Sequence, residues 1–139
     1  MNDRPSTINS PTKAYTYEPK TIARAKRALS CSPFRLKLFQ DMRNQSVPIA
    51  QIAGDEGIKL GYATKAFSEP KIEDKLVWLI NVGLLRREVD GQGLTDSFRL
   101  TPLGREIVSE WSNTENKIPP ASIIDRVSNW LNRWLKLSL

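Results

Sequence analysis

The spacing of hydrophobic residues in the middle of the chain predicts a helix that is buried along one side. Ile72, Leu76 and Leu79 recur at intervals of three and four residues, which places them on one helical face. Gly83 follows and is a suitable residue to end this helix, because glycine adopts the left-handed backbone conformation without a Cβ penalty. We therefore expect a helix from Glu69 to Val82.

Beyond this helix the period changes to that of a strand. Leu85, Arg87 and Val89 alternate with Arg86 and Glu88 on the opposite side. A turn sequence, Asp-Gly-Gln-Gly, follows directly, and a second stretch with an apolar face then returns along the first. A hairpin of two strands is only marginally stable alone, so these strands must pack against helices.

A further helix is expected immediately after the hairpin. Thr101 suits the N-cap position and Pro102 the first helical position. Ile107, Val108 and Trp111 continue an apolar face along the helix. The middle of the chain is thus predicted to run helix, β-hairpin, helix.

The sequence before this region predicts three more helices. The first spans 20–30, the second opens at Ser32-Pro33, and a short third opens at Ser46-Val47-Pro48. Residues 55–67 show no clear period, although Tyr62 to Phe67 could form an extra helical turn. Ser68 is the expected N-cap of the helix that ends near Gly83.

The length of 139 residues and the apolar fraction of 40% suit one modest domain with tails. Residues 1–19 are polar and are expected to be disordered. Residues 20–111 form the expected domain, with a basic N-terminal helix. Residues 112–120 read as a linker and 121–139 as an amphipathic C-terminal helix.

The apolar stripe of this expected C-terminal helix must be buried against another surface. It consists of Ile123, Ile124, Val127, Trp130, Leu131, Trp134 and Leu135. The same chain, a second subunit in a homodimer, a protein partner or a membrane interface could each provide the cover. Trp78 is also off the main face of its helix, where a terminal segment or a partner could cover it. The predicted partner or membrane interface is therefore Trp78, Trp130, Leu131, Trp134 and Leu135.

Composition argues against several kinds of chemistry. The chain has no histidine, and its single cysteine, Cys31, excludes an intramolecular disulfide and a multi-cysteine zinc site. Cys31 reads as a small semi-buried hydrophobe, with a reactive thiol as the alternative. The sequence contains neither of two glycine-rich motifs that bind phosphate groups, GxxxxGK[ST] and GxGxxG. No secretory signal or bilayer-spanning run is recognised. We expect no enzyme activity, no cofactor and no metal, and a cytoplasmic location.

The net charge of +6 is unevenly distributed. Residues 1–43 have nine basic and three acidic side chains, which is a net +6. Residues 44–110 have eight basic and ten acidic side chains, a net −2, and residues 111–139 have four and two, a net +2. Most of the positive charge therefore lies outside the predicted helix–hairpin–helix region.

The run GLLRREVDGQGLTDSFRLTPLGREI resembles the recognition-helix end, wing and next helix of winged-helix regulators of the MarR and PadR types. The phrase LTPLGR is common where the wing ends in such families. The resemblance implies an α+β, mostly α fold, a winged helix. This is a three-helix helix-turn-helix core plus a β-hairpin wing, with extra N- and C-terminal helices. The whole chain is also similar to a small family of uncharacterised cyanobacterial proteins.

The regulator resemblance implies transcription regulation through double-stranded DNA, by a dimer. The helix Glu69 to Val82 would enter the major groove, and the wing, Val89 to Ser97, would approach the minor groove. The candidate DNA-binding residues are Lys20, Arg24, Lys26, Arg27, Lys65, Lys71, Lys75, Arg86 and Arg87.

Two features depart from that pattern. The wing has Asp90 and Asp96 but no Lys or Arg at its tip, and the recognition helix has Glu73 and Asp74. The alternative is a non-catalytic winged-helix interaction or dimerisation module, as in the N-terminal domains of small-molecule methyltransferases. Its C-terminal helix would then dock to a partner or a membrane surface.

Overall fold

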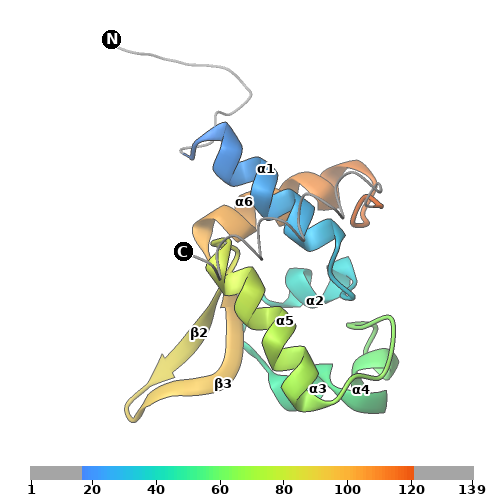
Figure 1. Ribbon diagram of the computed structural model, residues 1–139, viewed down its shortest axis with the longest axis vertical. Helices are drawn as coiled ribbons and strands as arrows, with labels where there is room; N and C mark the ends of the chain where they lie inside the picture. The colour runs from blue at the N-terminus through green and yellow to red at the C-terminus, as the bar shows by residue number, and fades with distance from the viewer. Residues whose placement is uncertain (1–16, 121–139) are drawn as a thin grey trace, which may run out of the picture.

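Helices and short strands alternate along the part of the chain that the structure describes. The computed structural model describes residues 17–120. In chain order the elements are α1 (Pro19–Ser30), α2 (Leu36–Asp41), β1 (Val47–Pro48), α3 (Ile49–Ile52), α4 (Gly54–Lys59), α5 (Glu69–Asn81), β2 (Leu85–Asp90), β3 (Gly93–Leu100) and α6 (Pro102–Thr114). Within residues 17–120 the fold is therefore mixed α+β, with helices and a small three-stranded antiparallel sheet (Figure 1).

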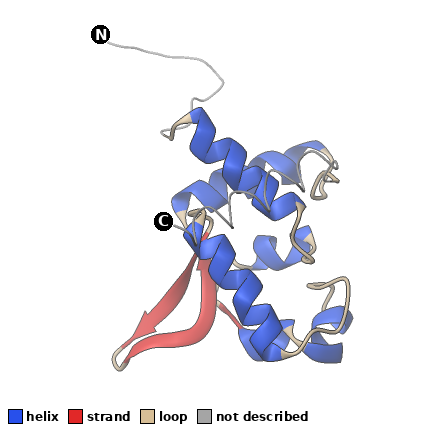
Figure 2. Cartoon of the chain, in the orientation of Figure 1, coloured by secondary structure: helices blue, strands red, loops and turns tan. Residues whose placement is uncertain are grey.

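The β-hairpin stands at one side of the helices. Figure 2 shows β2 and β3 projecting away from the helical part, so that only the base of the hairpin lies against helices. α5 runs beside the hairpin, α1 packs against α5, and α2 packs against α6. The core at this junction contains the fully buried side chains of Leu76, Leu85, Phe98 and Ile107.

The end of α5 agrees with the prediction from sequence. Ser68 occupies the N-cap position, and the helix ends at Asn81, one residue before the predicted Val82. Gly83 has a φ of +89°, the left-handed conformation that made glycine the expected residue there. The Leu84 amide donates a hydrogen bond of 2.9 Å to the Leu79 carbonyl, which closes the helix end.

The three strands are arranged in the order β1-β3-β2. β2 and β3 pair with Leu85 opposite Leu100 and Arg87 opposite Phe98. The short helix expected at Ser46-Val47-Pro48 is present as α3, but it begins at Ile49 with Pro48 as its N-cap, because Val47 and Pro48 pair with β3. Pro48 is tolerated there since β1 is an edge strand, where a missing N–H is harmless.

The second helix begins later than predicted. Ser32-Pro33 does not open it; α2 starts at Leu36, after Arg35 as N-cap. The Ser32 hydroxyl donates to the Leu29 carbonyl at 2.8 Å and thus closes the end of α1. The chain is then extended, because the Arg35 amide donates to the Tyr62 carbonyl and Phe34 forms a β-bridge with Ala63.

The segment without a clear period contains a helix and a stretch of extended chain. Residues 54–59 form α4, which follows α3 almost without a break. The extra helical turn considered for Tyr62 to Phe67 is absent, since those residues include the bridge to Phe34. The Tyr62 hydroxyl also donates to Asp41 at 2.6 Å. These long-range bonds replace the local bonds that a helical turn would need.

The helix after the hairpin begins as predicted and extends further. The Gly104 amide donates to the Thr101 side chain at 3.1 Å, which is the expected N-cap bond. α6 continues to Thr114, so the expected linker at 112–120 begins inside a helix. Gln40 donates to Ser112 and Asn116 at 2.8 and 2.9 Å, which fastens the end of α6 to α2.

Two sequence predictions lie outside the described residues. They are the disordered tail, apart from residues 17–19, and the amphipathic helix at 121–139 with Trp130, Leu131, Trp134 and Leu135. None of the helices in residues 17–120 is long and apolar enough to cross a membrane.

Candidate interaction surface

The outward face of α5 is acidic and apolar. Successive residues of an α-helix are about 100° apart, so the face opposite Ile72, Leu76 and Leu79 carries positions 70, 73, 74, 77 and 81. These positions are Pro70, Glu73, Asp74, Val77 and Asn81, and all five are exposed. The face includes two carboxylates and no lysine or arginine.

The lysines of α5 lie on its flank, beside Trp78. Lys71 is exposed. The ammonium group of Lys75 lies 5.8 Å from the centre of the Phe67 ring, within the range of a cation–π contact. Lys65, before the helix, is exposed. The cations predicted to read DNA from α5 are therefore displaced from its most exposed face.

Arg87 fastens the hairpin to α5. One nitrogen of its guanidinium lies 2.8 Å from a carboxylate oxygen of Glu73, and the group stacks 4.8 Å from the centre of the Phe98 ring. The other terminal nitrogen donates to the Thr95 carbonyl at 3.4 Å. Because its side chain is only 20% exposed, Arg87 serves the fold here. The neighbouring Arg86 is exposed.

The tip of the hairpin exposes apolar side chains. Val89 and Leu94 are directly opposite each other across the two strands, with exposed fractions of 57% and 73%. The pairing register shifts between Arg87 and Val89, and such irregularities re-aim side chains. Leu85 and Val89, which alternation places on one side of the strand, therefore differ in burial: Leu85 is buried and Val89 is exposed. Beyond this register shift the two strands extend past the helices, which therefore do not cover Val89.

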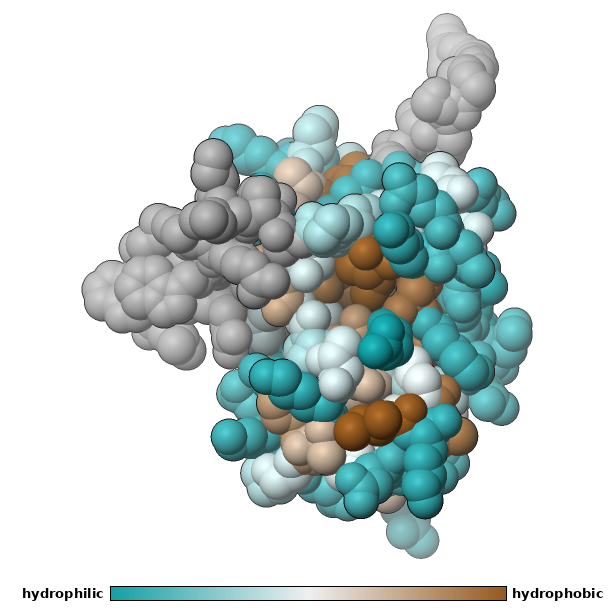
Figure 3. All heavy atoms as spheres, turned by 90° about the vertical axis from the view of Figure 1, so that its right-hand side faces the viewer, coloured by the Kyte–Doolittle hydropathy of each residue, from teal (hydrophilic) through white to brown (hydrophobic). Residues whose placement is uncertain are grey.

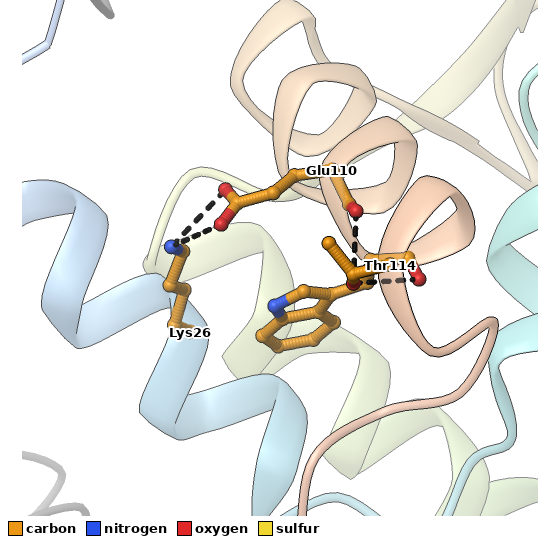
Figure 4. Close-up of polar contacts among 4 residues, drawn as sticks. Lys26, Glu110 and Thr114 are labelled. Atoms are coloured by element: carbon orange, nitrogen blue, oxygen red, sulfur yellow. Dashed lines mark hydrogen bonds and ion pairs between the residues drawn. The ribbon is translucent and has the colours of Figure 1, made fainter. Parts of the chain in front are cut away.

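The basic residues of α1 divide into two groups. Lys26 reaches α6, where its ammonium lies 3.2 and 3.3 Å from the two carboxylate oxygens of Glu110 (Figure 4). Lys20, Arg24 and Arg27 instead line one side of a hollow of about 430 Å³ on the surface of α1. Lys20 is exposed and the two arginines are half-buried. The Nε atoms of Arg24 and Arg27 are buried without a hydrogen-bond partner within residues 17–120, so this second group offers only part of its charge outward.

Trp78 is buried within the fold. Its exposed fraction is 7%, and its neighbours around a narrow hollow include Ala28, Cys31 and Lys75. The prediction that Trp78 belongs to an exposed interface is therefore wrong. The alternative, cover by the N-terminal helix, agrees with the packing of α1 on α5.

Sequence reasoning missed one buried polar cluster. Burial and the hydrogen bond to Asp41 raise the pKa of Tyr62 to about 12, so its hydroxyl remains a proton donor at neutral pH. Burial raises the pKa of Asp41, but hydrogen bonds from Tyr62 and Lys37 outweigh it and lower the pKa overall. At neutral pH this pairing of an ionised acid with a protonated phenol makes a structural tie between α2 and the segment after α4.

A further hollow of about 670 Å³ has Arg35, Lys37 and Lys117 in its lining. On the side of the molecule shown in Figure 3, short hydrophobic stretches are interrupted by hydrophilic side chains. Within residues 17–120, no group of three His, Cys, Asp or Glu side chains could hold a metal ion.

A comparison with known protein families identifies the family of this chain. Residues 15–133 match the family described as Npun_F0494-like. The chain belongs to this Npun_F0494-like family. The match extends from before α1 to well beyond α6, so the family region includes most of the segment after Pro120. No curated protein and no solved structure matches the chain.

Proposed function

We propose that this Npun_F0494-like protein has a winged-helix fold. The order of α2, β1, the α3–α4 pair, α5 and the β2–β3 hairpin supports this proposal, because a winged helix joins a three-helix core to such a wing. The strand order β1-β3-β2 also agrees, since it places the hairpin beside the short strand that precedes α3. In this fold α5 corresponds to the recognition helix.

We further propose that the protein is a non-catalytic protein-interaction module that binds its partner through α5 and the hairpin tip. The single observation that carries this proposal is the chemistry of that surface. The outward face of α5 presents Asp74 and Val77 beside Glu73, whose carboxylate is paired with Arg87, and the hairpin tip presents Val89 and Leu94. Carboxylates beside exposed apolar side chains suit a protein surface with an apolar patch and basic neighbours.

The same surface is poorly suited to a DNA backbone. Affinity for duplex DNA depends on cations that replace the counterions of phosphates. The hairpin tip has Asp90 and Asp96 without a lysine or arginine, and Arg87 is held by Glu73. Carboxylates that point toward phosphates would repel them. We therefore place protein binding before the DNA binding that the sequence resemblance implied.

DNA binding is the second candidate, and the basic side of α1 favours it. Lys20, Arg24 and Arg27 follow one another at helical spacing around a hollow. Exposed Lys65, Lys71 and Arg86 could add further contacts. Under this candidate the protein would bind phosphates mainly through α1, with weak sequence selectivity.

Fluorescence anisotropy with a mixed-sequence duplex at low and moderate salt separates the two candidates. The interaction module predicts no binding by the full-length protein even at low salt. The DNA-binding candidate predicts non-specific dissociation constants of about 10⁻⁴ to 10⁻⁶ M at physiological salt, which tighten steeply as salt falls. Binding of that kind, lost in the Arg24→Glu/Arg27→Glu variant, would replace the first proposal with the second.

Quantitative co-purification tests the proposed surface directly. The Val89→Ser/Leu94→Ser variant removes the apolar side chains from the hairpin tip without removing a buried contact. We expect it to lose a specific partner that wild type and Arg24→Glu/Arg27→Glu both retain. Equal recovery of every co-purified protein by all three forms would show that the hairpin tip is not the interface.

A further inference from the structure

The hollow of about 670 Å³ lies where three segments that are far apart in the sequence meet. They are the start of α2, the extended chain after α4 and the residues that follow α6, and all three lie on one side of the molecule in Figure 1. Pockets that bind small molecules usually have volumes of roughly 300–1,000 Å³. The hollow is therefore large enough for a small-molecule ligand.

Hydrogen bonds and packing hold the walls of this hollow in place. The Arg35 amide donates to the Tyr62 carbonyl at 2.9 Å, which joins the start of α2 to the chain after α4. Gln40 of α2 donates to the side chain of Asn116 at 2.9 Å, and Ile118 packs against the core. Because the walls are fixed by the fold itself, a ligand would not have to order them on binding.

The charged side chains around the hollow are basic. Arg35, Lys37 and Lys117 belong to its lining, and the lining within residues 17–120 includes no Asp or Glu. The ammonium of Lys37 is paired with the Asp41 carboxylate at 3.1 Å. Arg35 and Lys117 form no ion pair within the described part of the chain. Two positive charges at the hollow are therefore unmatched.

The rest of the lining supplies apolar surface and a hydrogen-bond donor. Phe34 and Leu36 are buried, and Ile118 is half-buried. The side-chain oxygen of Asn116 accepts the bond from Gln40, so its amide nitrogen is left without a partner among residues 17–120. Apolar side chains with a few polar groups that fix the orientation of the ligand are typical of small-molecule sites.

We propose that this hollow binds a small phosphomonoester with an apolar body. A phosphomonoester has a charge of about −1.5 to −2 at neutral pH, which matches the two unpaired charges of Arg35 and Lys117. The planar guanidinium of Arg35 suits two phosphate oxygens at once, and Lys117 adds a point charge. The apolar side chains of the lining contact the body of the ligand. This site is separate from α5 and the hairpin tip, so the inference does not rest on the proposed function.

An NMR titration of the full-length protein with phenyl phosphate at low salt tests this proposal. We expect saturable shifts of the amide signals of Gly61, Asn116 and Lys117, which line the hollow. Inorganic phosphate lacks the apolar body and should bind more weakly at the same signals. Benzoate has the ring but only one negative charge, and it should also bind more weakly than phenyl phosphate.

Two double variants show which charges are responsible. Arg35→Gln/Lys117→Gln removes both unpaired charges from the hollow and should raise the dissociation constant of phenyl phosphate about tenfold or more, because hydrogen bonds to an anion are lost. The matched control, Lys71→Gln/Arg86→Gln, removes one lysine and one arginine that are exposed elsewhere and should bind like wild type. Circular dichroism checks the fold, and Lys117→Gln alone replaces the double variant if that variant unfolds.

Several results would overturn the proposal. The hollow would not be a phosphomonoester site if phenyl phosphate caused no saturable shift, or if the shifts were confined to signals outside it, such as those around Lys20 and Arg24. Equal weakening by the two double variants would mean that the protein attracts anions only through its net charge. If inorganic phosphate or benzoate bound as tightly as phenyl phosphate, the hollow would not select a phosphomonoester with an apolar body.

Discussion

The two ends of the β-hairpin are built from similar residues but have opposite surroundings. At the base, Leu85 faces Leu100 and both are buried, and Phe98 is fully buried. At the tip, Val89 faces Leu94 and both are largely exposed. The same kind of cross-strand apolar pair thus stabilises the core at one end and is open to solvent at the other.

The difference teaches that the helices decide which apolar pair is structural. The base contacts α5 and α6, whereas the tip projects beyond them (Figure 1). Apolar burial stabilises a fold in proportion to the area removed from water, so only the base contributes much. Exposed apolar residues at the tip are therefore available for binding.

The largest expected contrast comes from truncating one apolar side chain at each end. Phe98→Ala should lower the free energy of unfolding by about 3–5 kcal/mol, because it leaves a cavity in the core. Leu94→Ala, at the exposed tip, should change it by no more than about 0.5 kcal/mol. Urea denaturation measures both. Comparable losses would mean that the tip is covered in solution.

Glycine substitutions should show the same contrast with a smaller effect. A Cβ at Gly104 would collide with the Leu84 carbonyl oxygen, so Gly104→Ala should cost about 1–3 kcal/mol of stability through overpacking. Nothing lies within 4 Å of a Cβ at Gly91 in the tip, and Gly91→Ala should be close to neutral. The midpoints of thermal unfolding check the order. If Gly91→Ala is the more damaging change, the contrast between base and tip is lost.

Removing a single hydrogen bond at the base and another at the tip should also give unequal losses of stability. Thr101→Val removes the N-cap of α6 at the base and should cost about 0.5–2 kcal/mol. At the tip the Gln92 amide donates to the Asp90 carboxylate at 2.7 Å, but this bond is exposed, and Asp90→Ala should cost less than Thr101→Val. The midpoints of denaturant unfolding measure the two losses of stability. A larger loss for Asp90→Ala would contradict the conclusion that the base of the hairpin contributes more to stability than the tip.

The smallest effect is expected midway along the hairpin. A double-mutant cycle with Arg87→Ala and Glu73→Ala should give a coupling energy of about 0.2–1 kcal/mol, because the carboxylate is half exposed. The coupling should fall at high salt. A coupling of zero at low salt would mean that the ion pair does not hold the hairpin to α5 in solution.

Much of the fold was predictable because it depends on local patterns. The helical spacing of Ile72, Leu76 and Leu79 predicted α5, and Gly83 marked its end. The cap at Thr101 predicted the start of α6. In each case the signal and the structure lie within a few residues of each other.

The errors occurred where distant segments meet. Val47 pairs with Phe98, 51 residues away, and Phe34 bridges Ala63. Nothing in the local sequence around Ser46 or Ser32 records those partners, so the starts of α2 and α3 were predicted a few residues too early. The strand and the extended turn form because they satisfy backbone hydrogen bonds with chain far away.

The candidate interaction surface, too, depends on contacts between distant segments that the local sequence does not predict. Sequence alone determined that this family member has the helix–hairpin–helix segment and that its positive charge is concentrated outside it. Only the tertiary structure decided which charges are available: Arg87 is paired with Glu73 and Lys26 with Glu110, while Lys71 and Arg86 are exposed. The physical reason is that local spacing sets which helical face a residue occupies, whereas its burial and its partner depend on what other segments bring against that face.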